Sequence, residues 1–197
     1  MANALLLGRR EPFVSVQAAL VVAIAAVFLA IVVARLARAW RRYRGERVIA
    51  CPETRQPAGV EVDARHAAAT ALGGAPELRL SNCSRWPERA GCGQPCLSQI
   101  AAAPEDCLVR NILAKWYEGK TCASCGQAVG ESVRLAAQPA LIGADGVSFE
   151  WSQVSADKLH ETLAAAKPVC FVCHTAGTLV REHPDLVSDR SCRSSVN

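Results

Sequence analysis

The sequence predicts an α+β protein in which one N-terminal transmembrane helix is followed by a small cysteine-rich domain. Three observations support this fold class. Residues 12–34 contain no charged side chain and are rich in Ala, Val, Ile and Leu. The short segments after residue 47 change between strand-like alternation and helical periodicity. All ten cysteines follow the apolar segment, and four of them form two Cys-x-x-Cys pairs.

The apolar segment is expected to remain in the membrane as an anchor. As a helix rising about 1.5 Å per residue, residues 12–34 would span a hydrocarbon core of about 30 Å. A cleaved signal peptide fits less well, because the run is too long and no small-residue cleavage site follows it. Only Arg9 and Arg10 precede the run. By the positive-inside rule, the larger basic flank that follows it places the C-terminal side in the cytoplasm. This flank comprises Arg35, Arg38, Arg41, Arg42, Arg44 and Arg47, with Trp40 and Tyr43 interleaved.

The distribution of charge predicts contact with membrane lipids and not with nucleic acid. Eight of the 22 Lys and Arg residues lie within residues 1–47, whereas the remainder has 14 against 16 Asp and Glu. A mildly acidic domain lacks the basic face of a nucleic-acid-binding protein. The basic segment suits anionic lipid headgroups. We therefore expect a single-pass protein of the cytoplasmic membrane.

A cysteine-rich subdomain is expected at residues 48–118. Strands are predicted at 48–52, which ends in a turn at Pro52, and at 59–63, which alternates apolar and polar residues. An alanine-rich helix at 65–72 would stop at Gly73-Gly74. Pro and Gly should keep the segment around Cys83, Cys92 and Cys96 irregular. An amphipathic helix is expected from Pro104 to about Glu118, closed by Gly119.

A metal-binding subdomain is expected at residues 119–187, followed by a flexible tail at 188–197. The predicted elements are a strand at 132–136, a hairpin at 140–151 around the Asp145-Gly146 turn, and helices at 156–166 and 175–182. Ser155 is the expected N-cap of the first of these helices. Cys192 in the tail is expected to be a free thiol.

The two Cys-x-x-Cys pairs predict a metal site. The segments are Cys122-Ala-Ser-Cys125-Gly126 and Cys170-Phe-Val-Cys173-His174. Each turn can direct two thiolates at one ion, and the glycine after Cys125 permits a positive φ at low cost. In a reducing cytoplasm, clustered cysteines more often bind metal than form disulfides. The four thiolates would form a tetrahedral Cys₄ site suited to zinc.

The order of these elements resembles that of the treble-clef and zinc-ribbon families, in which a Cys-x-x-Cys turn and a hairpin are followed by a second pair of ligands at the start of a helix. The resemblance covers Cys122 to about His183, and the spacer between the pairs departs from it because it holds an extra helix. It implies a structural zinc that supports partner binding. The whole chain resembles a single-span membrane protein of bacterial type. The implied function is an accessory subunit that contacts a protein partner or a larger membrane complex.

An electron-transfer subunit is the alternative function. Cys170-Phe-Val-Cys173-His174 matches the attachment signature of a c-type haem, in which His174 would be the iron ligand. Met1 is the only methionine, so a His/Met cytochrome is excluded in practice. The sequence has no phosphate loop, nucleophile elbow or His-Glu-x-x-His motif, and no catalytic residue is assigned. An enzyme with an exchangeable zinc ligand remains a third interpretation.

The upstream cysteines form a less determinate group. Cys51, Cys83, Cys92 and Cys96 could bind a second zinc or an iron–sulfur cluster, since thiolates serve both and spacing does not separate them. Cys107 could replace Cys51 as the fourth ligand. The sequence therefore predicts one zinc, or two.

Overall fold

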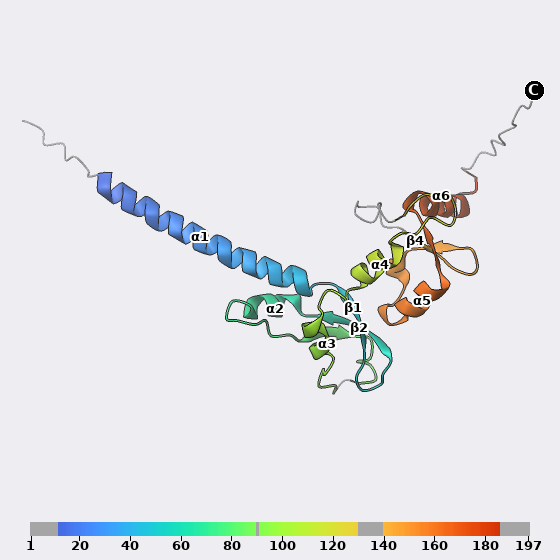
Figure 1. Cartoon of the computed structure of the whole chain (residues 1–197), viewed down its shortest axis with the longest axis horizontal. Coiled ribbons are helices and arrows are strands. Elements are labelled where there is room, and N and C mark those ends of the chain that lie inside the picture. Colours follow the sequence, from blue (N-terminus) through green and yellow to red (C-terminus); the bar gives the residue numbers. More distant parts are fainter. Residues whose placement is uncertain (1–11, 90, 130–139, 186–197) are drawn as a thin grey trace, which may run out of the picture. The chain divides into compact units, whose positions relative to one another are not determined.

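The computed structural model describes residues 12–89, 91–129 and 140–185, and helices and strands are mixed along the chain (Figure 1). The chain divides into two compact units, Met1–Arg44 with Asp63–Arg79, and Gly45–Val62 with Leu80–Asn197. This division differs from the expected subdomains, because Asp63–Arg79 groups with the N-terminal helix. The predicted strand at 132–136, Arg9, Arg10 and the tail with Cys192 lie outside the described residues.

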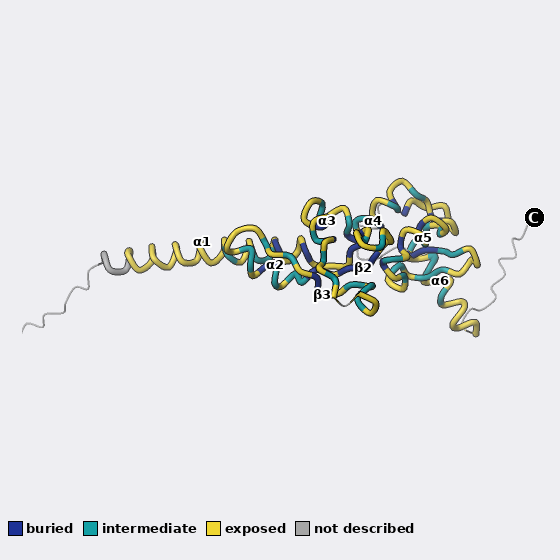
Figure 2. Tube along the Cα trace, turned by 90° about the horizontal axis from the view of Figure 1, so that it is seen from below, coloured by how far each residue is buried: buried dark blue, intermediate teal, exposed yellow. Residues whose placement is uncertain are grey.

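The first unit is dominated by helix α1 (Pro12–Tyr43). Its stretch Val16–Tyr43 has 28 residues, and the most apolar part has a mean hydropathy of 2.9 and no buried residue. Large apolar side chains such as Val22 and Phe28 are about two-thirds exposed, at 67% and 68%, and the helix is exposed along most of its length (Figure 2). Helix α1 is therefore long and apolar enough to cross a membrane.

The short helix α2 (Ala64–Thr70) packs against α1 within the same unit. Asp63 caps α2, since its carboxylate accepts the His66 N–H at 2.9 Å. The same carboxylate pairs with Arg79 at 2.6 Å. The His66 N–H and then the Arg79 guanidinium lower the pKa of Asp63. Arg35, Arg38 and Arg42 of α1 line one groove with the segment that follows α2.

The second unit begins with an antiparallel sheet in the order β1-β2-β3. Its strands are β1 (Glu46–Ala50), β2 (Pro57–Val62) and β3 (Leu80–Cys83). Both predicted strands are thus present, with shifted ends, whereas β3 was not predicted. A Cβ atom added to Gly59 would lie 2.9 Å from the Cβ of Ala156. A side chain at Gly59 would therefore force β2 away from the C-terminal half of this unit.

Arg47 does not belong to the exposed basic flank in which the sequence placed it. It is fully buried in β1, and its Nη1 donates to the Gly45 carbonyl at 2.8 Å. Burial lowers the pKa of Arg47, and the neighbouring Cys107 thiol opposes that shift. Arg47 is therefore part of the folded domain and is not available to a lipid headgroup.

Two helices follow the first sheet, and both differ from the prediction. Helix α3 (Leu97–Ala102) was not predicted, and it buries Ile100 completely. Helix α4 (Val109–Tyr117) begins five residues after Pro104, because residues 104–107 form turns and Leu108 is extended. The predicted start at Pro104 was wrong. Gly119 takes a φ of +69° just after the helix, as expected of a helix end.

The second sheet has the order β5-β4-β6, with both pairs antiparallel. Strands β4 (Ala140–Ile142) and β5 (Ser148–Phe149) form the predicted hairpin, but β5 is shorter because Trp151–Gln153 turns into a 3₁₀ helix (η2). Strand β6 (Lys167–Val169) was not predicted.

The segment between η2 and β6 contains two consecutive helices. The 3₁₀ turn η3 (Ala156–Lys158) precedes α5 (Leu159–Ala165), where one helix at 156–166 was expected. Ser155 does not cap this segment, because its side chain makes no capping hydrogen bond and instead bonds the Asp157 carboxylate. The C-terminal helix α6 (Phe171–Glu182) begins four residues earlier than predicted.

One apolar core joins these elements of the second unit. Helices α4 and α5 contribute Leu113, Tyr117 and Leu159, and the second sheet contributes Leu141 and Val169. The Tyr117 hydroxyl donates to the Ala140 carbonyl at 2.9 Å, and the Trp116 Nε1 donates to the Leu163 carbonyl at 3.1 Å. The core thus holds β6 and the start of α6 against α4. It therefore positions Cys122 and Cys125, which follow α4, and Cys170 and Cys173, which follow β6.

Candidate metal centre

The first cysteine pair lies in a tight turn after α4. The Cys122 N–H donates to the Gln127 carbonyl at 2.8 Å, and the Gly126 N–H donates to the Cys122 carbonyl at 2.9 Å. Gly126 has a φ of +72°, a conformation that glycine adopts without steric cost. The turn therefore closes as predicted, with Cys122 buried in the core and Cys125 exposed.

The second pair lies where β6 passes into α6. Cys170 is the N-cap of α6, and its Sγ accepts the Cys173 N–H at 3.5 Å. Two hydrogen bonds join this segment to the first turn. The Ala123 N–H donates to the Pro168 carbonyl at 2.8 Å, and the Cys170 N–H donates to the Cys122 Sγ at 3.3 Å. The backbone thus holds the two pairs face to face.

The four sulfur atoms form a compact group. The Sγ atoms of Cys122, Cys125, Cys170 and Cys173 all lie within 4.8 Å of one another, and Cys125 and Cys170 are 3.8 Å apart. At a zinc–sulfur distance of about 2.3 Å, tetrahedral geometry places sulfurs about 3.8 Å apart. Among the described residues, this is the one group of three or more His, Cys, Asp or Glu side chains gathered in this way. The four predicted cysteines can therefore hold a metal ion.

The electrostatics of the group also favour a cation. Burial alone would raise the pKa of Cys122, but the N–H groups of Cys170, Cys125 and Ser124 lower it to about 6. The Cys170 thiol and then the Cys125 thiol raise the pKa of Cys173 to about 12. Adjacent thiols drive each other's pKa values apart because two thiolates at this separation repel. A bound divalent cation removes that repulsion and allows all four to ionise.

His174 lies beside the cysteine group but belongs to a separate contact. His174 lies in the first turn of α6, and its Nδ1 is 2.9 Å from the Oγ of Ser148 in β5. This hydrogen bond joins α6 to the hairpin. Ser148 was not singled out in the sequence, because its contact with His174 depends on the pairing of β4 with both β5 and β6.

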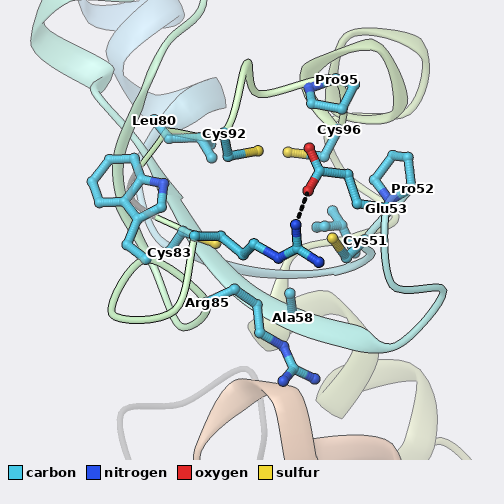
Figure 3. A pocket seen from close by; sticks show the side chains of 13 residues that line it. Cys51, Pro52, Glu53, Ala58, Leu80, Cys83, Arg85, Cys92, Pro95 and Cys96 are labelled. Atoms are coloured by element: carbon cyan, nitrogen blue, oxygen red, sulfur yellow. Dashed lines mark ion pairs between the residues drawn. The ribbon is translucent and has the colours of Figure 1, made fainter.

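The upstream cysteines come together in a second place. Cys51, Cys83, Cys92 and Cys96 line one small pocket, and Figure 3 shows their side chains around it. Burial, with the neighbouring Cys83 and Cys92 thiols, raises the pKa of Cys96 to about 11. Cys107 lies elsewhere, with its Sγ 3.6 Å from the Ala103 carbonyl and 3.7 Å from that of Pro104.

Comparison of the chain with protein-family models, with curated proteins and with solved structures finds no match.

Proposed function

We propose that this chain is a single-span membrane protein whose domain is folded around a structural zinc ion and acts as an accessory subunit at the cytoplasmic membrane. The observation that carries the proposal is the gathering of four sulfurs from two separate segments within 4.8 Å. Four protein thiolates complete the tetrahedral shell of zinc and leave no position for a substrate or water. A closed shell of this kind favours a structural role over catalysis.

The anchor in this proposal is α1, and its flank supports the orientation. Arg41 and Arg42 lie in the last turn of the helix, and Arg35, Arg38 and Arg42 line the groove beside α2. Guanidinium groups at the end of an apolar helix bind anionic headgroups, and their excess on this side favours a cytoplasmic domain.

This orientation predicts the behaviour of a reporter fused to the C-terminus. An enzyme that is active only in the periplasm should stay inactive in this fusion, because the domain remains on the cytoplasmic side. A reporter that is active only in the cytoplasm should be functional at the same position and serves as the matched control. Periplasmic activity would overturn the orientation.

Helix α6 supports an interaction role. None of its residues is buried, and Phe171, Val172, Leu179 and Val180 are between 46% and 72% exposed. At 100° per residue, these four side chains fall on one half of the helix, with His174 and Arg181 on the other half. Membrane-surface helices carry many Lys and Arg residues on the polar face, whereas α6 has Arg181 balanced by Glu182. The occupant that fits is therefore an apolar groove on a protein partner.

The identity of the metal tests the central claim. Full-length protein purified in detergent should contain zinc and show no visible colour. Replacing Cys122, Cys125, Cys170 and Cys173 together by Ser should remove about one equivalent of zinc per chain. Replacing Cys107, which lies outside the group, should remove none.

The same preparation discriminates the electron-transfer alternative. A haem Soret band, or the visible absorbance of iron–sulfur chemistry that disappears in the four-serine variant, would establish a redox centre and overturn the zinc proposal. No observation among the described residues favours haem, since the Cys170 and Cys173 thiols face the other pair and His174 bonds Ser148. Failure of the four-serine variant to lose any metal would also contradict the proposal.

A further inference from the structure

A second metal site is suggested by four segments of the upstream region that meet at one point. Cys51 directly follows β1, Cys83 is the last residue of β3, Cys92 lies in the next loop, and Cys96 is the N-cap of α3. All four line the same pocket. In Figure 3 the Cys92 and Cys96 sulfurs point toward each other across its upper part, with Cys51 and Cys83 below them. The local sequence around each cysteine does not explain why four thiols from separate elements meet at one place.

The backbone around these cysteines is held by specific hydrogen bonds. The Cys51 N–H donates to the Gln56 carbonyl at 2.8 Å, which closes a turn in which Arg55 takes a φ of 57°. Gln94, between Cys92 and Cys96, also has a φ of 57°, and its side chain accepts the Leu80 N–H at 2.9 Å. A left-handed conformation is costly for a residue other than glycine. The two turns therefore hold the cysteine positions at the expense of local backbone strain.

Helix α3 is tied to the same place. The Gln99 Nε2 donates to the carbonyl of Ala50, the residue before Cys51, at 2.8 Å. Cys96 itself makes no capping hydrogen bond to α3, and it is 5% exposed. The Cys96 thiol is thus not used to cap the helix, and it lines a pocket with three other cysteines. This arrangement is more typical of a metal ligand than of a capping residue.

The pocket has the size for a single cation bound by four thiolates. Its volume is about 20 Å³, and roughly 10–15 Å³ is enough for one water-sized occupant. Four thiolates on a divalent ion leave a net negative charge, and Arg85 and Arg89 also line the pocket. Arg89 pairs with Glu53 at 3.6 Å, and the Arg85 Nε is buried with no hydrogen-bond partner among the described residues. The Arg85 guanidinium also donates to the Gln56 Oε1 and pairs with Glu88 at 3.8 Å, so both arginines already have carboxylate partners.

We propose that Cys51, Cys83, Cys92 and Cys96 bind a second zinc ion. Zinc is the ion that four thiolates in a tetrahedral arrangement favour. The sulfurs are less closely gathered than those of the first group, so binding the ion would draw the four segments together. The site would hold α3 and the loop before it against the first sheet. This proposal rests on the cytoplasmic orientation of the proposed function, which keeps the thiols reduced, but it does not depend on the accessory role.

The number of zinc ions per chain tests the proposal. The full-length protein in detergent should carry two equivalents by elemental analysis and by native mass spectrometry. The variant with Ser at Cys51, Cys83, Cys92 and Cys96 should carry one, as should the variant with Ser at the four cysteines of the first group. Cys107→Ser should carry two. If only the second site fails to bind zinc, the full-length protein should carry one zinc, and only the variant with Ser at the four cysteines of the first group should lose it. This result differs from the one expected if the first site fails.

A measurement on the unaltered protein covers the case in which the upstream variant does not fold. Under reducing conditions, alkylation followed by peptide mapping should find Cys51, Cys83 and Cys92 protected in the metal-loaded chain and modified after a chelator is added. One zinc per chain with these thiols modified at the outset would overturn the proposal. So would disulfide bonds among the four in freshly isolated protein, or iron in place of zinc.

Discussion

Removing the metal from the group of Cys122, Cys125, Cys170 and Cys173 is expected to release α6 from the domain. Helix α6 has no buried residue, so apolar packing contributes little to its docking. Hydrogen bonds that tie its start to the domain include the Cys170 N–H bond to the Cys122 Sγ and the contact of His174 with Ser148, and Cys170 and Cys173 pack against the edge of the apolar core. Without an ion, the thiols also repel one another once they ionise.

A comparison of the free energies predicts that metal removal has a large effect on α6. Structural zinc contributes roughly 10–16 kcal/mol of apparent binding free energy in small zinc domains. The whole free energy of unfolding of a domain is only about 5–15 kcal/mol. Two hydrogen bonds contribute about 1–3 kcal/mol together. The hydrogen bonds that remain after metal loss therefore cannot hold a twelve-residue helix such as α6 in place.

Hydrogen exchange on the full chain in detergent measures this release. Amides of Phe171–Glu182 should lose protection when a chelator is added, whereas amides of α4 and α5 should keep more of theirs, because Leu113 and Leu163 pack in the apolar core. Cys173→Ser should reproduce the loss without a chelator, and Cys107→Ser should not. Unchanged protection of α6 after the metal is removed would show that the helix is held by something other than the ion.

The local part of this site could be predicted from the sequence. A Cys-x-x-Cys-Gly turn requires only its own residues and a glycine that accepts positive φ, and Gly126 does so. The pairing of Cys122 and Cys125 with Cys170 and Cys173 followed from the chemistry of zinc, which needs four ligands. The identity of the four candidate ligands was therefore predicted without the fold.

The elements that position the second pair could not be predicted. Lys167-Pro168-Val169 contains a proline, which argues against a strand, yet β6 is an edge strand of the second sheet and can accept it. The start of α6 was placed too late because Cys170 was treated as a ligand only, and not also as the N-cap that fixes the helix. Arg47 was misplaced for a similar reason, since a run of arginines near a membrane helix does not reveal which of them enters a strand.

The upstream pocket shows the same limit. The sequence favoured Cys51 as the fourth partner of Cys83, Cys92 and Cys96, but spacing alone did not decide between Cys51 and Cys107. The choice depends on β1 pairing with β2, and β2 with β3, which brings the end of β1 near Cys83. Long-range strand pairing of this kind leaves little trace in the local sequence.

Charged substitutions on the exposed face of α6 are expected to disrupt the proposed complex with a protein partner. The double variant Leu179→Asp, Val180→Asp replaces side chains that are 48% and 50% exposed and lie away from the cysteines, so the fold and the zinc content should not change. In the complex, each new carboxylate would be buried without a partner at a cost of several kcal/mol. Since about 1.4 kcal/mol corresponds to a tenfold change in affinity, the complex should weaken at least a hundredfold.

The complex can be followed as a species larger than the chain itself, on native gels of mild detergent extracts. Arg181→Gln is the matched control, because Arg181 is exposed on the same helix but on its polar side, where it contacts Thr178. This control should retain the larger species, whereas the double variant should migrate as the chain alone with its zinc still bound. A double variant that retains the larger species would place the interface elsewhere. Chelation should have the same effect as the double variant, since a released α6 no longer presents an ordered apolar face to the partner.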